Sequence, residues 1–162
     1  MGSDTLYVRD RSGEFVLATT EVIVAAAKAH LRRRMRRGAK LASPGLVRDF
    51  LAVTLGERDC EYFCVLFLDA QHRFLRFVEL FRGTIDRASV HPREVVKAAL
   101  DAQAAVVVLV HNHPSLVGEP SAADELITRR LRDALGLIDV RVIDHLIVAG
   151  SDITSFAERG LL

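Results

Sequence analysis

The chain has 162 residues, half of them hydrophobic, and its 22 Lys and Arg against 21 Asp and Glu give a net charge of +1. This length suits one domain with a substantial core, and the near balance of charge excludes attraction to nucleic acid or an anionic membrane through the overall field of the chain. The two cysteines, Cys60 and Cys64, are too few for a disulfide framework, so we expect reduced thiols.

The first expected element is a helix that begins after Thr19 and extends to about Arg37, before Gly38. Residues 1–42 are therefore expected to form an N-terminal helical extension. Five arginines stand at the end of this helix, and they invite a nucleic-acid partner because arginine binds phosphate. Cations at a helix C-terminus also stabilise the helix dipole, and no aromatic side chains are interleaved for base stacking, so both interpretations stay open. The arginines are Arg32, Arg33, Arg34, Arg36 and Arg37.

The rest of the chain, residues 43–162, alternates between helical and strand patterns. The expected order is a helix at Pro44–Leu55, strands at Glu61–Asp69 and Phe74–Leu80, a helix at Val95–Ala102, a strand at Ala104–Val110, a helix from Ser121 to about Leu135, and a strand at Val140–Val148. This order predicts an α/β (α+β) domain in which helices flank a mixed central sheet.

The motif His111-Asn112-His113-Pro114 lies at the exit of the valine-rich strand. Side chains two residues apart in a strand point the same way, so His111 and His113 can present two imidazoles to one ion while Asn112 faces away. The loop after Pro114 returns the chain to the helix that carries Asp124. Two histidines and one carboxylate leave a fourth tetrahedral position for water, which is typical of a catalytic Zn²⁺ site.

A structural interpretation of the same residues stands beside the metal site. Ser121 and Asp124 also form a capping box at a helix start, and for these two alone capping is the better explanation. We expect His145 to satisfy hydrogen bonds within a buried strand together with Asp144, and not to supply a fourth ligand.

The spacing of His111, His113, Ser121 and Asp124 resembles the JAMM motif of JAB/MPN-domain metalloproteases. Further motifs resemble one branch, the RadC family: Gly83-Thr84, His91-Pro92-Arg93-Glu94, His111-Asn112-His113-Pro114-Ser115, Asp144-His145 and Ser155-Phe156-Ala157-Glu158-Arg159-Gly160. The resemblance covers roughly residue 43 to the C-terminus, and it departs from the family at Leu116-Val117, where a glycine commonly follows Ser115. It implies a JAB/MPN fold of the cytidine-deaminase-like type.

The resemblance also implies roles for single residues. His111, His113 and Asp124 would bind zinc, and Ser121 would stabilise the oxyanion that forms when water attacks a carbonyl. The general base would be a glutamate, for which Glu61, Glu79 and Glu94 are candidates. We choose Glu61, because its segment resembles the glutamate-containing stretch before the first central strand of related proteases. Glu94 suits the first turn of a helix, and Glu79 suits a strand position paired with an arginine.

The sequence therefore predicts a zinc-dependent metallopeptidase or isopeptidase-like hydrolase that acts on a peptide or protein. The alternative is a protein of DNA repair or mobile elements that binds DNA or a protein partner through a non-proteolytic metal site. The chain is too short for the helix-hairpin-helix module of longer family members, which weakens the DNA interpretation. No apolar stretch reaches the roughly 18 residues of a membrane helix and no signal sequence is evident, so we expect a cytoplasmic protein without a membrane partner.

Overall fold

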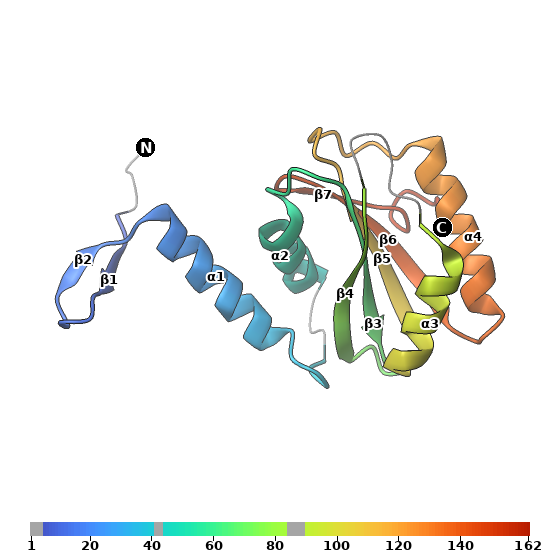
Figure 1. The fold of residues 1–162 in the computed structure, drawn as a ribbon, viewed down its shortest axis with the longest axis horizontal. Coiled ribbons are helices and arrows are strands. Elements are labelled where there is room, and N and C mark those ends of the chain that lie inside the picture. Colours follow the sequence, from blue (N-terminus) through green and yellow to red (C-terminus); the bar gives the residue numbers. More distant parts are fainter. Residues whose placement is uncertain (1–4, 41–43, 84–89) are drawn as a thin grey trace.

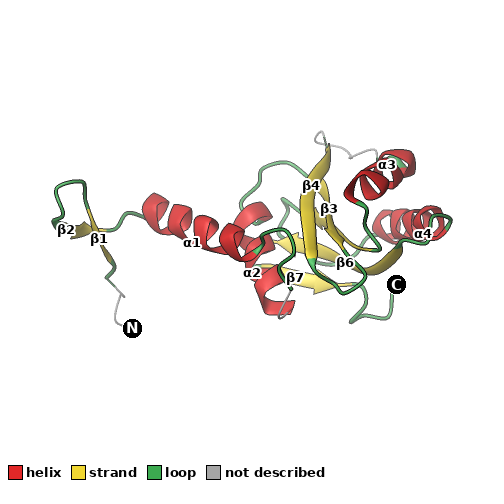
Figure 2. Ribbon diagram, turned by 90° about the horizontal axis from the view of Figure 1, so that it is seen from below, coloured by secondary structure: helices red, strands yellow, loops and turns green. Residues whose placement is uncertain are grey.

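The computed structural model describes residues 5–40, 44–83 and 90–162. A mixed sheet lies between α2 on one face and the pair α3 and α4 on the other (Figures 1 and 2). The elements are β1 (Tyr7–Arg9), β2 (Phe15–Leu17), α1 (Thr20–Arg34), α2 (Pro44–Leu55), β3 (Tyr62–Leu68), β4 (Phe74–Arg82), α3 (Pro92–Ala102), β5 (Val106–Asn112), α4 (Ala122–Gly136), β6 (Arg141–Ala149) and β7 (Asp152–Ser155). The expected mixed sheet flanked by helices is confirmed.

The five strands of the sheet are ordered β4-β3-β5-β6-β7. Only β5 and β6 pair in parallel, with α4 as the crossover between them, and every other neighbouring pair is antiparallel. Strand β5 has a partner on each side and helices over both faces, so all seven of its residues are buried. This explains its continuous valine-rich sequence, because a strand buried on both faces needs no polar alternation.

Alternate side chains of the central strands pack into two separate hydrophobic cores, one on each face of the sheet. Leu66 and Val110 face the core under α2, which Leu51 and Leu55 complete. On the opposite face, residues such as Leu109 pack beneath α3 and α4. His111 belongs to the phase of Leu109, so the sheet directs its imidazole to the side where α4 begins.

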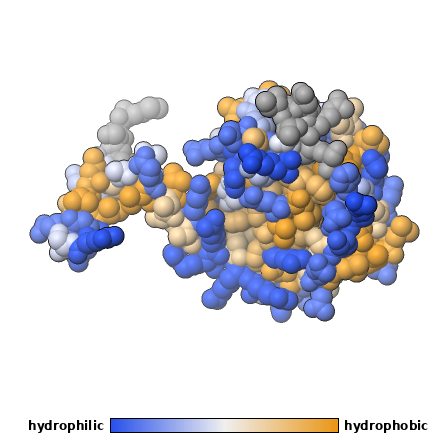
Figure 3. Space-filling model, in the orientation of Figure 1, coloured by the Kyte–Doolittle hydropathy of each residue, from blue (hydrophilic) through white to orange (hydrophobic). Residues whose placement is uncertain are grey.

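The N-terminal segment forms an arm that projects from the sheet domain (Figure 1). It consists of the β1–β2 hairpin and α1, and no residue of α1 is buried. The hairpin leaves apolar side chains in the solvent, among them Tyr7, Phe15 and Leu17 with 61 to 65% of their surface exposed, and Figure 3 shows hydrophobic residues on the arm beside hydrophilic ones.

The predicted end of the first helix was wrong. Helix α1 ends at Arg34, and Met35 caps it with its side chain 5% exposed. Met35 packs into the same core as Phe50 and Phe74, and the chain then forms a bridge to β4, in which the Gly38 amide donates to the Phe74 carbonyl at 2.7 Å. Burial of Met35 turns the backbone away from the helix axis, so Arg36 and Arg37 lie beyond the helix.

Sequence analysis also missed three short strands. Strands β1 and β2 flank a turn in which the Asp10 carboxylate accepts hydrogen bonds from the Ser12 and Glu14 amides, and β7 extends the sheet beside β6. Strands of three or four residues carry too little alternation to stand out in a sequence. The predicted domain boundary after residue 42 lies outside the described residues. In the part of the chain that is described, no helix is long and apolar enough to cross a membrane.

The packing of α2 against the β6–β7 turn generates the first prediction. A Cβ at Gly56 would collide with the carbonyl oxygens of Gly150 and Ala52, the latter at 2.5 Å. We expect Gly56→Ala to lower the free energy of unfolding by roughly 1–3 kcal/mol, because backbone must move to admit the methyl group.

The measurement is urea denaturation, with Gly136→Ala as the matched control. Gly136 ends α4, and no atom lies within 4 Å of the position that a Cβ would take there. This variant should therefore be neutral or more stable by up to about 1 kcal/mol. Equal stability of Gly56→Ala and the native protein would contradict the close approach.

Candidate metal centre

Three side chains from two elements converge where β5 ends and α4 begins. His111 lies in β5, His113 follows the strand, and Asp124 occupies the first turn of α4. The Nε2 atoms of the two histidines are 2.9 Å apart. Asp124 Oδ1 lies 3.2 Å from His111 Nε2, and Oδ2 lies 3.6 Å from His113 Nε2. Ligand atoms of all three residues lie within 4.8 Å of one another, as a shared metal ion requires.

The hydrogen-bond partner of His113 fixes its tautomer. Its Nδ1 lies 2.6 Å from the carbonyl oxygen of Val117, which can only accept a hydrogen bond. The hydrogen of a neutral His113 ring is therefore on Nδ1, and the lone pair of Nε2 faces the other two residues. A second ring nitrogen bonded to a backbone carbonyl is common among metal-binding histidines.

A buried relay fixes the tautomer of His111. The Thr128 hydroxyl donates to the Asp124 carbonyl at 2.5 Å, so it accepts from Nδ1 of His145 at 2.6 Å. His145 then accepts through Nε2 from Nδ1 of His111 at 2.8 Å. His111 is left with its Nε2 lone pair toward His113 and Asp124. The lone pairs of the two Nε2 atoms and the Asp124 carboxylate thus face one point. These three electron-rich groups repel one another unless a cation lies between them.

Burial keeps His145 neutral and therefore able to accept. The side chain has no exposed surface and contacts Phe156, whose ring centroid is 4.7 Å away. Desolvation lowers the pKa of His145 well below its ordinary value, and the nearby His111 adds to this effect. His145 thus has protein partners on both ring nitrogens, which confirms the expectation that it satisfies buried hydrogen bonds.

The pKa values of the other two charged partners shift in opposite directions. A hydrogen bond to Asp124 raises the pKa of His113 against the effect of burial, and the charge of Glu61 adds to the increase. Burial acts to raise the pKa of Asp124, but its contacts with His111, His113 and Ser121 outweigh this effect and hold the pKa below its ordinary value. Asp124 is therefore an ionised carboxylate that is available as a ligand.

Ser121 and Asp124 form the predicted capping box. The Asp124 amide donates to Ser121 Oγ at 3.2 Å, and the Ser121 amide donates to Asp124 Oδ2 at 2.8 Å. The Ser121 hydroxyl also donates to Oδ2, at 2.7 Å. The helix cap therefore also positions a candidate ligand, because its hydrogen bonds fix the rotamer of the Asp124 carboxylate beside the histidines.

Asn112 clamps the backbone on both sides of Glu61. Its Nδ2 donates to the Cys60 carbonyl at 2.9 Å, and its Oδ1 accepts from the Tyr62 amide at 2.8 Å. As predicted, Asn112 faces away from the two histidines. Sequence analysis missed this clamp, which ties the segment carrying Glu61 to the strand carrying His111.

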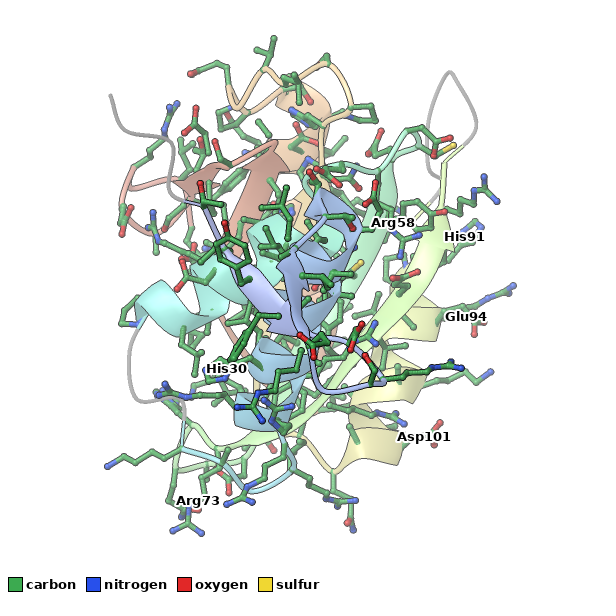
Figure 4. The ribbon with its side chains drawn as sticks, turned by 90° about the vertical axis from the view of Figure 1, so that its left-hand side faces the viewer. His30, Arg58, Arg73, His91, Glu94 and Asp101 are labelled. Atoms are coloured by element: carbon green, nitrogen blue, oxygen red, sulfur yellow. The ribbon has the colours of Figure 1, made fainter. Side chains whose placement is uncertain are left out.

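Of the three glutamate candidates, Glu61 lines the same cavity as the two histidines, Ser121 and Asp124. Glu79 lies in β4 and pairs with Arg58 at 2.9 Å. Glu94 lies in the first turn of α3, within 3.3 Å of Lys97, and Figure 4 shows it on that helix. The structure therefore brings Glu61 to the candidate metal centre and leaves Glu79 and Glu94 outside the cavity lining.

The cavity over the three ligands has a volume of about 570 Å³. Its polar floor holds the candidate ligands, and apolar side chains form much of the wall. Such a mixture is typical of a small-molecule or peptide site. The remaining lining residues are Phe63, Val90, Ala122, Ala123, Leu126, Ile127 and Arg130.

Comparison with known proteins adds the family. Residues 41–161 match the model of the RadC-like JAB domain. The chain belongs to this family. Relatives named UPF0758 proteins are 54% identical over 150 residues in Thioalkalivibrio sulfidiphilus, 55% over 139 in Shewanella amazonensis and 48% over 159 in Halorhodospira halophila. These alignments cover 93, 83 and 98% of the chain but 67, 62 and 71% of the relatives.

The loop after the histidines adopts a backbone conformation that favours glycine, although the residue there is a leucine. Leu116, at the position where the sequence departs from the resemblance, has a φ of 60°, in the left-handed region. Its amide donates to the His113 carbonyl at 3.0 Å, and the next residue, Val117, supplies the carbonyl that orients the His113 ring. The left-handed turn at Leu116 thus brings the Val117 carbonyl to Nδ1 of His113.

The raised pKa of His113 generates the second prediction. Because the pKa of His113 is raised in the folded state, the stability that this residue contributes is full below its ordinary value of 6.5 and is lost as pH rises through the raised value. We expect the free energy of unfolding of chelator-treated protein to fall across this interval. Urea denaturation at a series of pH values measures it.

Asp124→Asn is the matched variant, because it removes the charge that raises the pKa of His113. Its stability should fall less steeply over the same pH range. An unchanged slope in this variant would show that another group causes the dependence.

Proposed function

We propose that the protein is a zinc-dependent hydrolase that cleaves peptide or isopeptide bonds. The observation that supports this most is the meeting of two imidazole Nε2 atoms and an ionised carboxylate beside Glu61 in one cavity. A metal ligand group, a nearby acid and an apolar wall are the parts that metal-assisted amide hydrolysis needs. Membership of the RadC-like JAB family agrees with this chemistry.

The donor set fits zinc. His111 and His113 offer neutral nitrogen and Asp124 offers oxygen, and three protein ligands leave an open position for water or substrate. The hydrogen bonds at Val117 and His145 turn Nε2 of both rings toward Asp124, where they would hold an ion, as the outer partners of zinc-binding histidines do. When bound, zinc would polarise a substrate carbonyl and lower the pKa of water.

Glu61 is the general base in this proposal. Its carboxylate lines the cavity that holds the ligands, and Asn112 fixes the backbone on both sides of it. Glu61 accepts a proton from the attacking water and delivers it to the amine nitrogen as the carbon–nitrogen bond breaks. The same carboxylate thus acts first as a base and then as an acid.

Ser121 donates its hydroxyl hydrogen to the oxyanion that develops on the substrate. In the structure this hydrogen is directed to Asp124 Oδ2 at 2.7 Å. A hydroxyl group rotates about its C–O bond, so Ser121 can release Oδ2 to a ligand role and turn toward the substrate oxygen while its Oγ still caps α4.

The third prediction tests the role of Glu61. Glu61→Gln should bind one equivalent of zinc with nearly native affinity, because Glu61 is not among the three ligands. It should lose at least about 100-fold in rate, which is the range that removal of a general base causes. Zinc is measured by elemental analysis and competition with a chromogenic chelator. Cleavage of a peptide and isopeptide mixture is followed by mass spectrometry.

Glu94→Gln is the matched control, since Glu94 carries the same charge but pairs with Lys97 on α3. It should keep both zinc and activity. Full activity of Glu61→Gln together with an inactive Glu94→Gln or Glu79→Gln would refute the assignment of the base. Failure of the native protein to bind zinc would refute the metal centre.

A second candidate function is nucleic-acid binding by a basic surface at the end of α1. Seven exposed Lys and Arg side chains lie there, because an isolated β-bridge between Lys40 and Arg73 brings their two segments together. None of the seven has a side-chain hydrogen bond or ion pair with a described residue. The rest of the chain carries 15 Lys and Arg (22 less these seven) against 21 Asp and Glu. The net charge is therefore near zero although this surface is strongly positive. The seven are Arg32, Arg33, Arg34, Arg36, Arg37, Lys40 and Arg73, and Figure 4 shows Arg73.

The fourth prediction follows from phosphate binding by this surface. Replacement of Arg33, Arg36 and Arg37 by Gln should weaken binding to a duplex DNA oligonucleotide and reduce the slope of log Kd against log salt by about 2 to 3. Fluorescence anisotropy at several salt concentrations measures both. Native protein without salt-dependent affinity for single or double strands would contradict this second function.

A further inference from the structure

The cavity above the candidate ligands has one positively charged lining residue whose partner the structure does not supply. Of the described residues that line it, Arg130 alone carries a permanent positive charge. The side chain is exposed, and it has no hydrogen bond or ion pair with any residue that the structure describes. Its neighbour Arg129, by contrast, pairs with Glu125 at 3.3 Å on the solvent side of α4.

The position of Arg130 follows from the geometry of α4. Ala123, Ile127 and Arg130 all line the cavity, and their i, i+4, i+7 spacing places them on one face of the helix. Arg130 therefore stands at the far end of a stripe that begins beside the ligand Asp124. Arg130 follows Asp124 by six positions, which is a rise of about 9 Å along the helix axis.

Neither acid among the described lining residues pairs with Arg130. Asp124 is engaged by His111, His113 and Ser121. Glu61 forms no hydrogen bond or ion pair with Arg130. The cavity thus has a negative end around the candidate ligands and a positive end at Arg130, with Val90, Leu126 and Ile127 among the apolar residues of its wall.

We propose that Arg130 binds a carboxylate of the substrate and so selects acidic peptides for the metal centre. This inference rests on the proposed peptide hydrolysis. The planar guanidinium forms two parallel hydrogen bonds with a carboxylate, which a neutral amide cannot match. An extended peptide advances about 3.3 to 3.6 Å per residue, so the separation along α4 corresponds to about two or three residues between the scissile carbonyl and the carboxylate.

The carboxylate has two possible sources, the C-terminus of a peptide and an Asp or Glu side chain. Four acetylated tetrapeptides separate them: Ala-Leu-Gly-Gly with a free C-terminus, the same peptide as its amide, and the amides of Ala-Leu-Glu-Gly and Ala-Leu-Gln-Gly. Binding is measured by isothermal titration calorimetry to chelator-treated protein, so that neither metal nor turnover contributes to the result.

For native protein we expect one of two acidic peptides to bind about tenfold more tightly than its neutral counterpart, as a charged hydrogen-bonded pair allows. The two pairs are the free C-terminus against its amide and the Glu peptide against the Gln peptide. In Arg130→Gln this ratio should fall to within about twofold. The matched control Arg129→Gln changes the same residue type on the same helix, outside the cavity lining, and should keep the native ratio. Arg130→Glu should reverse the preference in favour of a peptide amide with Lys in place of Glu.

Two outcomes would overturn the inference: native protein that binds none of the acidic peptides more tightly than its neutral partner, and an Arg130→Gln variant that retains the preference while its melting temperature is native. Preference that depends on Arg130 in a protein that neither takes up zinc nor cleaves peptides would refute the proposed hydrolysis and leave the carboxylate subsite standing. The two hypotheses therefore fail separately.

Discussion

The buried hydrogen bonds from the Asp124 carbonyl through Thr128 and His145 to His111 determine which atoms face the cavity. The direction of this chain follows from its first member, because a backbone carbonyl can only accept. Each later group is then assigned one role, and the His111 ring must present Nε2 to the cavity. Val117 imposes the same orientation on His113 from the loop. The candidate metal centre is thus oriented by groups that are not themselves candidate ligands.

Much of this arrangement was predictable from local sequence. Strand periodicity places His111 and His113 on one side of β5, and a helix start brings Asp124 near them, so the JAMM-like spacing predicted their meeting. The exit of β5 and the entry to β3 are neighbours in the sheet, which explains why Glu61 lines the same cavity as the two histidines. The catalytic and ligand roles assigned to these residues remain predictions.

Other features depend on contacts between segments that are distant in sequence. Thr128 and Arg130 look like ordinary helix residues until α4 is placed against the cavity, and Asn112 acquires a function only when β3 lies beside β5. The early end of α1 likewise depends on the pocket that buries Met35. Local propensity favoured a longer helix, but tertiary packing decided its last residue.

The Asn112 clamp has a mechanical consequence for the cavity. Two adjacent residues of β5 position the candidate ligands and the candidate base. The His111 ring faces Asp124, and Asn112 holds the backbone on both sides of Glu61. These two hydrogen bonds oppose any sliding of β5 past the segment that carries Glu61. The imidazole and the acid therefore move together when the sheet bends or twists slightly, and their spacing is preserved.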